Sequence, residues 1–309
     1  MPAAVVLFAV VTLLRVASQG TETVAPGDVA WRVGASCAVA PRADQGPWRA
    51  VSLGLGAELG LRDGVSLELD WQPGYVVWSA VDPAGAPVLP GDATRSGPRD
   101  AWAAVRLQLA GDPGLVLQHS RLRAVIAPGL VLPFPDPDWE RERGRALDGK
   151  RYIREAPDRH AIGIGARLAL EYELREAWGV RVRAGCVWFL PKESASIADP
   201  GTLNHTDYGN ELLTAVAPYG ALDMGRTILR AEGEVSGVFT PEILVNGGAS
   251  VGDGFLLSVE PRLGIVLAAR PKPVAVTFGY RIPVARRNAD SEHRLSLALA
   301  SASLPRGRP

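Results

Sequence analysis

Cysteine is scarce in this 309-residue chain: there are only two, Cys37 and Cys186. A pair of cysteines cannot form the disulfide framework that stabilises small secreted domains, and it offers too few ligands for a structural zinc site. We therefore predict no metal and no cofactor. A net charge is also missing, because 33 basic residues balance 33 acidic ones. The sequence thus gives no electrostatic reason to expect nucleic-acid binding.

Long apolar runs are missing as well, except in residues 1–18 (MPAAVVLFAVVTLLRVAS). This run is too short to span a bilayer as a helix, but it has the size of a signal-peptide core. We predict a signal peptide over 1–18, cleavage before Gln19, and one domain over 19–309. No cysteine follows the apolar core, so a lipoprotein anchor is not expected. A buried N-terminal helix or a misplaced start codon is the alternative.

A helical period of 3.6 residues is absent outside this leader. Apolar side chains instead alternate with polar or glycine positions in several segments, and the clearest are 51–61, 162–174, 178–190 and 255–267. Successive side chains of a strand point to opposite faces, so each segment has one apolar and one polar face. Runs of 11 to 15 residues exceed the usual soluble strand and suit a tilted strand that crosses a membrane.

The connections between these segments alternate in length. Tight connections fall at 62–63, 111–114, 175–177, 224–225 and 270–273, and longer ones at 41–46, 80–100, 135–159, 191–210, 240–253 and 286–292. All long loops therefore lie at one end of the sheet. This order predicts an all-β fold, an antiparallel up-and-down transmembrane β-barrel of about 12 strands with long external loops and tight periplasmic turns.

A secreted soluble β-sandwich is the alternative fold, since its strands alternate too. Sandwich strands are shorter, and their solvent face is usually rich in Lys, Thr and Glu. Here the polar face is glycine mixed with Arg and Glu, which suits a lumen where large charged side chains fit between gaps. Aromatic residues make up only 6% of the chain, so they give only partial support for the aromatic girdles that a membrane barrel carries at its two interfaces. Trp102 has the parity of the polar face.

Leader, strand length and loop alternation together resemble bacterial outer-membrane β-barrel proteins of the small porin or channel type. The resemblance covers nearly the whole mature chain and lies in architecture, not in a motif. It implies a bacterial outer-membrane location, contact with outer-membrane lipid and insertion by the barrel-assembly machinery. The chain departs from this class at its last strand, 293–303, which lacks the usual terminal aromatic residue.

Charged residues of both signs share the polar faces of the predicted strands. By parity we expect the following to line the lumen: Arg106, Arg121, Arg123, Arg167, Arg181, Arg183, Arg230, Arg262, Arg281, Glu58, Glu68, Asp70, Glu171, Glu173, Glu232, Glu234 and Glu260. Such charges must be paired or hydrated. A hydrated lumen predicts a passive channel or transporter for small hydrophilic solutes, anionic ones among them. A paired lumen predicts a non-conducting structural or adhesive surface barrel.

Catalysis is not predicted, because no nucleophile and base are paired by the strand pattern. His119 adjoins Ser120, so their side chains should point to opposite faces, and His205 falls in a predicted loop. The two cysteines fall on the first and seventh strands, on opposite walls of a barrel, and we expect free thiols that face lipid. The longest loop, 133–159, is expected to be surface-exposed.

Overall fold

The structure is a computed structural model that describes residues 21–40, 48–79, 94–134, 161–175, 177–195, 203–251, 253–267, 273–287 and 292–301. The signal peptide predicted over 1–18 and its cleavage point lie outside the described residues, as does most of the 133–159 loop. Among the described residues, no helix is long and apolar enough to cross a membrane.

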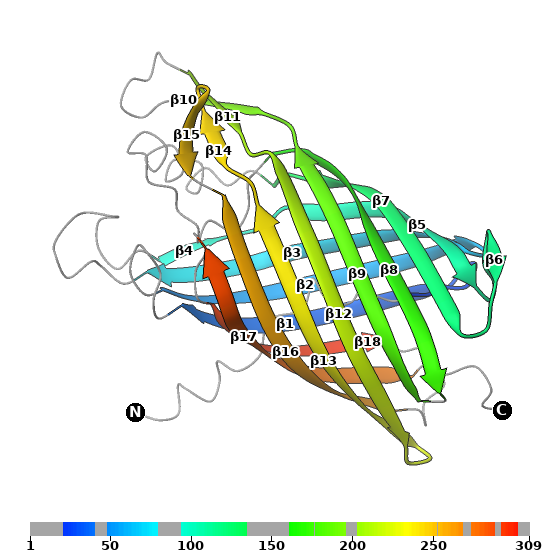
Figure 1. The fold of residues 1–309 in the computed structure, drawn as a ribbon. Coiled ribbons are helices and arrows are strands. Elements are labelled where there is room, and N and C mark those ends of the chain that lie inside the picture. Colours follow the sequence, from blue (N-terminus) through cyan, green and yellow to red (C-terminus); the bar gives the residue numbers. More distant parts are fainter. Residues whose placement is uncertain are drawn as a thin grey trace, which may run out of the picture.

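Twelve antiparallel strands form a closed barrel (Figure 1). Each pairs with its neighbours along the chain, and the ring closes where the first strand pairs with the last over eight residue pairs. The strands are β1 (Val29–Ala40), β2 (Trp48–Arg62), β3 (Val65–Ser79), β5 (Ala101–Gly111), β7 (Leu122–Leu132), β8 (Gly163–Arg175), β9 (Trp178–Phe189), β12 (Asn210–Asp223), β13 (Thr227–Thr240), β16 (Gly254–Leu267), β17 (Val274–Arg287) and β18 (His293–Ser301). The predicted twelve-stranded up-and-down barrel is confirmed, and the β-sandwich alternative is wrong because one sheet closes on itself.

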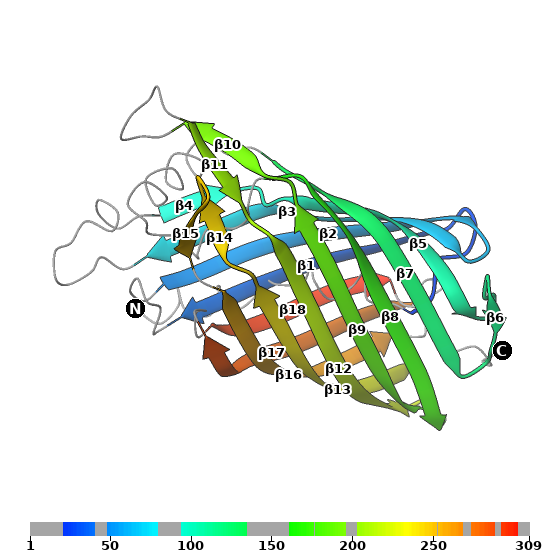
Figure 2. The same cartoon turned by 45° about the horizontal axis from the view of Figure 1, so that its top comes forward.

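Short strands extend the loop side of the barrel. β10 (Lys192–Ala195), β11 (Leu203–Asp207), β14 (Ile243–Val245) and β15 (Gly248–Val251) form a separate four-stranded sheet. Figure 2 shows this sheet beyond the ends of β9, β12 and β13. β4 (Thr94–Gly97) pairs with β3 near the same end. The long connections therefore carry structure of their own, while the turn side keeps short links such as Asp63-Gly64, where Gly64 has a φ of 72°.

One connection on the turn side differs from the sequence-based expectation of a tight turn at 111–114. The chain after β5 continues to residue 121 and includes β6 (Leu117–Gln118), which pairs in parallel with the end of β5. The His119 ring nitrogen Nδ1 accepts hydrogen bonds from the backbone N–H groups of Arg121 and Leu122, at 3.1 and 2.9 Å. These bonds fix the start of β7 at Leu122. Arg121 is thus exposed on the connection. The prediction that it lines the lumen is wrong, because it does not lie on a barrel strand.

Apolar side chains cover the outer wall of the barrel. Leu53, Leu55 and Leu59 on β2 are each about 40% exposed, whereas Ser52 on the opposite face of the same strand is 5% exposed. Trp178 and Trp188, at opposite ends of β9, are also exposed. A closed ring satisfies the backbone hydrogen bonds of every strand internally, which a bilayer demands. An apolar outer wall on such a ring is the surface that lipid tails contact.

The two cysteines are free, as predicted. Cys37 lies on β1 and Cys186 on β9, and five strands separate β1 from β9 along either direction of the twelve-strand ring. Cys186 is exposed and Cys37 partly exposed. Opposite walls of a barrel are too far apart for a disulfide, which needs Cα atoms within about 7 Å.

Candidate functional site

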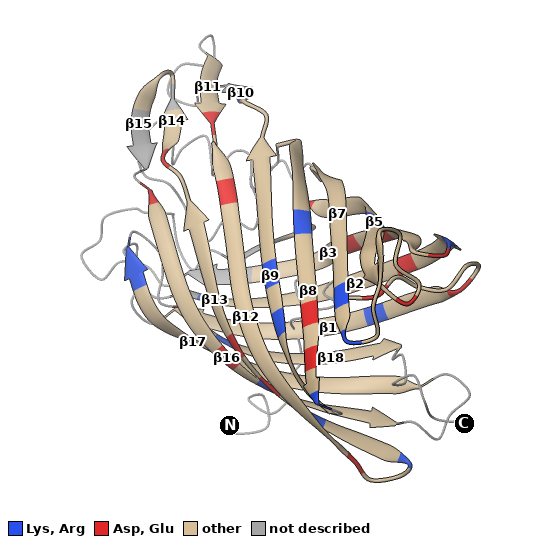
Figure 3. Cartoon of the chain, turned by 45° about the vertical axis from the view of Figure 1, so that its right-hand side comes forward, with Lys and Arg blue, Asp and Glu red and all other residues tan. Residues whose placement is uncertain are grey.

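Charged side chains gather inside the barrel, from its turn side to its middle. Figure 3 shows bands of both signs along β8 and blue bands along β9. We call the ion-paired interior set the charge belt. Its arginines are Arg32, Arg106, Arg123, Arg167, Arg181, Arg183, Arg230, Arg262 and Arg281, and its carboxylates are Glu22, Glu58, Glu68, Asp70, Glu171, Glu173, Glu232, Glu234 and Glu260. These pairs join nine guanidinium groups to nine carboxylates, and Arg294 of the last strand forms a further enclosed pair with Glu292.

One half of the belt is built around the carboxylates of β3. Glu68 accepts a hydrogen bond from Arg106 of β5 at 3.0 Å, and Asp70 pairs with Arg32 of β1. Arg167 of β8 reaches the same carboxylates, with its Nη1 3.2 Å from Asp70 and 3.5 Å from Glu68. β8 is separated from β3 by β5 and β7. This side chain therefore bridges parts of the wall that are not neighbours in the sheet.

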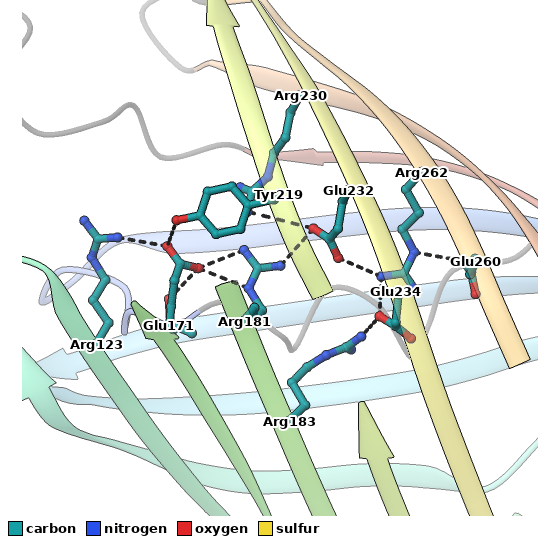
Figure 4. Close-up of polar contacts among 11 residues, drawn as sticks. Arg123, Glu171, Arg181, Arg183, Tyr219, Arg230, Glu232, Glu234, Glu260 and Arg262 are labelled. Atoms are coloured by element: carbon teal, nitrogen blue, oxygen red, sulfur yellow. Dashed lines mark hydrogen bonds and ion pairs between the residues drawn. The ribbon is translucent and has the colours of Figure 1, made fainter. Parts of the chain in front are cut away.

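The other half is centred on Glu171 of β8 (Figure 4). Its carboxylate accepts hydrogen bonds from Arg123 and Arg181, each at 2.9 Å, and from the Tyr219 hydroxyl at 3.0 Å. The Arg230 guanidinium lies over the Tyr219 ring, 4.4 Å from its centroid. A carboxylate with three such donors is strongly held, because hydrogen bonds to a charged acceptor are stronger than neutral ones.

From this centre the network continues across β13 to β17. Arg181 contacts Glu232 at 3.3 Å, and Arg262 contacts Glu232 at 3.1 Å and Glu234 at 2.7 Å. The chain of contacts then runs onward from Arg262 to Glu260 and from Glu260 to Arg281, while Arg183 of β9 pairs with Glu234. Four carboxylates of this half are each shared by two or more cations: Glu171, Glu232, Glu234 and Glu260. Removing one member would leave its partners buried with too little opposite charge.

Burial divides the belt into a closed part and a reachable part. The side chains of Arg106, Glu68, Glu234 and Glu260 are no more than 4% exposed, so they contact protein and not bulk water. Arg167 and Arg230 are 33% and 35% exposed, and Glu173 and Glu22 are similar at 34% and 31%. These four side chains are the ones that water or a solute reaches most easily in the described interior.

Toward the loop side, small and apolar side chains line part of the interior wall. Trp102, Ala104 and Ala127 form a buried cluster against Val131 and Val187. The Arg167 guanidinium lies 4.2 Å from the centroid of the Trp102 ring, so this cluster borders the charge belt directly. Trp102 is 3% exposed, which agrees with its expected inward parity. The loop side of the interior thus has an apolar patch beside Arg167, while the pair of Arg294 with Glu292 lies on another part of the wall.

All lumen candidates inferred from the sequence except Arg121 are members of the belt. The sequence reasoning missed Arg32 and Glu22. Arg32 could have been found, because it shares the inward parity of Gly34 and Ser36 on β1. Glu22 precedes the first strand, and no periodic pattern covers it. Its place in the belt follows from tertiary packing alone.

The described residues contain no group of three or more His, Cys, Asp or Glu arranged to hold a metal ion. His119, which adjoins Ser120, uses its Nδ1 to accept two backbone hydrogen bonds in the connection before β7. That nitrogen is therefore engaged in structural contacts with the backbone. His205 lies on β11, outside the barrel strands.

Comparisons with known proteins agree with the fold. An outer-membrane channel from Pseudomonas putida F1 is similar over 91% of this chain and 97% of its own, at 14% identity and a TM-score of 0.64. The NanC porin (7% identity, 89% of this chain and 100% of that one, TM-score 0.43) and the toluene transporter TodX of P. putida (11%, 90% of each, 0.39) are similar below a TM-score of 0.5, which is too low to carry an argument. No protein-family model and no curated protein matches the sequence.

The chain therefore has the fold of bacterial outer-membrane β-barrels. The closed twelve-strand ring, the apolar outer wall and the alternation of long loops with short turns place it in the bacterial outer membrane, surrounded by lipid. At 14% sequence identity, the similarity to the Pseudomonas channel shows the fold and no further property.

Proposed function

We propose that this barrel is a passive channel or transporter for small hydrophilic solutes of the outer membrane. The observation that carries the proposal is the charge belt, which combines buried ion pairs with a few guanidinium and carboxylate groups that remain about one-third exposed. A wall built only for stability has no need of charge in its interior, since apolar side chains of the same volume are as stable or more so.

The belt suggests how a solute would cross. Arg167 lies on the loop side of the belt, between the apolar cluster and the carboxylates of β3. An anionic group that reaches it can take the place of a carboxylate in a bidentate contact, so that the protein exchanges one ion pair for another without exposing a bare charge. The same logic favours anionic solutes. This exchange depends on the side chains of the belt that are about one-third exposed, such as Arg167, and not on the buried ones.

A non-conducting structural or adhesive barrel is the second candidate, and burial favours it. Nine cations and nine carboxylates neutralise each other, and several of them are almost fully enclosed. Twelve strands lie between the small barrels that side chains fill and the large ones that leave a channel. The two candidates share one fold, one location and assembly by the barrel-assembly machinery. They differ only in whether the belt lets solutes pass.

Planar-bilayer recording decides between them. The purified, heat-modifiable protein is expected to conduct, and Arg167→Gln is expected to lower its preference for anions, because the variant removes the most loop-side cation of the belt. Arg287→Gln is the matched control: it removes the same charge from a side chain that is 70% exposed and pairs with Asp253 outside the belt. Equal selectivity in both variants would contradict a role for the belt. Folded protein without any conductance would favour the structural barrel.

A further inference from the structure

The segment before β1, residues 21–28, lies in the turn-side mouth of the barrel and not outside it. Its C-terminal end is held by two backbone hydrogen bonds to β2, from Gly27 N to Gly60 O at 2.9 Å and from Gly60 N to Asp28 O at 3.0 Å. At Gly60 a side chain would meet the carbonyl oxygen of Ala25 at 2.0 Å, so only glycine allows this close approach. Thr21, at the other end of the segment, is 4% exposed.

Polar contacts carry the segment across the interior. Thr23 donates from both its backbone N and its hydroxyl to Gln108 Oε1 of β5, at 2.8 and 2.9 Å. The N–H of Val24 donates to Glu58 of β2 at 3.2 Å, and the Thr21 hydroxyl donates to Glu171 of β8 at 3.1 Å. The segment therefore contacts side chains of β2, β5 and β8 along one arc of the wall.

Glu22 joins the segment to the charge belt. Its carboxylate lies 2.7 Å from Arg123 Nε, and its carbonyl oxygen accepts a hydrogen bond from Arg106 Nη2 at 3.2 Å. Without Glu22 the belt has nine guanidinium groups and eight carboxylates, and with it the charges are equal. The contacts with the wall are hydrogen bonds and one ion pair, in which the side chains of Arg123 and Glu22 are 17% and 31% exposed. Water reaches this pair, which lowers its contribution toward that of a surface pair.

From these contacts we infer that residues 21–28 are a displaceable plug of the turn-side mouth, and that Glu22 sets the charge preference of the pore. When the segment leaves, the mouth widens and Arg123 keeps only Glu171 and Glu173 as partners, so the arginines of the belt exceed its carboxylates by one. The released pore then prefers anions, which is the specificity that the segment masks at rest. This inference rests on the proposed channel function, and the two can fail separately.

The test compares two variants that each remove one negative charge from the same segment. Glu22→Gln loses the ion pair with Arg123, whereas Asp28→Asn changes an exposed side chain and keeps the backbone bond to Gly60. In planar bilayers, Glu22→Gln is expected to raise the open probability about two- to fivefold, the range for loss of a half-exposed ion pair, and to shift selectivity toward anions. Asp28→Asn is expected to match the wild type.

A second measurement does not depend on conductance. Thr23→Cys, made with Cys37→Ser and Cys186→Ser, carries one thiol in the segment. A charged, membrane-impermeant thiol reagent is expected to modify it slowly, several times faster when Glu22→Gln is added, and no faster when Asp28→Asn is added instead.

The outcomes separate the two claims. Equal open probability and equal thiol reactivity in Glu22→Gln and Asp28→Asn would overturn the plug while leaving the channel intact. Faster labelling of Cys at position 23 without conductance in any folded variant would support a displaceable segment and overturn the channel. Higher open probability without a shift toward anions would overturn the charge role of Glu22.

Discussion

Glu234 offers the sharpest test of the charge belt as a stabilising network. Its side chain is 4% exposed, and it pairs with Arg183 and with Arg262, at 2.7 Å to the latter. Glu234→Gln keeps the size of the side chain and removes its charge, so both guanidinium groups stay buried with less compensation. Breaking one partner of a buried pair costs about 3–5 kcal/mol. We expect the free energy of unfolding to fall by about that amount.

The control is an ion pair with the same chemistry at the surface. Arg287 and Asp253 are 3.1 Å apart, and their side chains are 70% and 37% exposed. Asp253→Asn should therefore cost no more than about 1 kcal/mol. Urea unfolding of both variants in lipid vesicles, followed by tryptophan fluorescence and by the heat-modifiable gel shift, measures the difference. Equal losses in the two variants would refute the reasoning, since burial would then have no part in the energetics.

Three further predictions concern the chain as a membrane protein. N-terminal sequencing of the exported protein should return a start near Gln19, and an N-terminal Met would remove the predicted leader. An epitope inserted within residues 139–150 should be reached by antibody on intact cells, whereas one at Asp112-Pro113 should not, and the reverse pattern would invert the barrel. Non-reducing mass spectrometry should show Cys37 and Cys186 as free thiols, so a disulfide between them would contradict the strand order.

Strand number and order could be predicted because the strands are long and one face is uniformly apolar. On β2, the leucines at alternate positions are exposed to lipid while Ser52 and Gly56 face inward, as alternation requires. A one-residue slip in register would put every leucine in the interior. The local sequence therefore determines which face of each strand meets lipid and which faces the interior. Loop lengths then indicate the order of strands around the ring.

The connection after β5 could not be predicted from the same pattern. A Gly-Asp-Pro-Gly run indicates a tight turn, and the apolar residues that follow it alternate well enough to continue as a strand. In the structure, Leu115 N and Val116 N instead donate to backbone carbonyls of Gln108 and Leu109, at 2.8 and 3.0 Å. These contacts pull the segment back along β5. The turn forms at Asp112-Pro113, but the local backbone pairing that follows it keeps the next residues in the connection, and Arg121 leaves the interior as a consequence.

The pairing of the charges could not be predicted either, because parity says only which residues point inward. Arg167 and Asp70 lie 97 positions apart and on strands that are not neighbours, so neither strand register nor sequence spacing brings them together. The barrel interior does, because the curved wall brings side chains of β3 and β8 together across the two strands between them. Whether the lumen conducts depends on these cross-wall pairs. A charged face in a barrel sequence therefore predicts an interior site. Whether that site is open or closed depends on how evenly positive and negative side chains pair across the interior. It also depends on residues outside the strands, such as Glu22, that enter the interior.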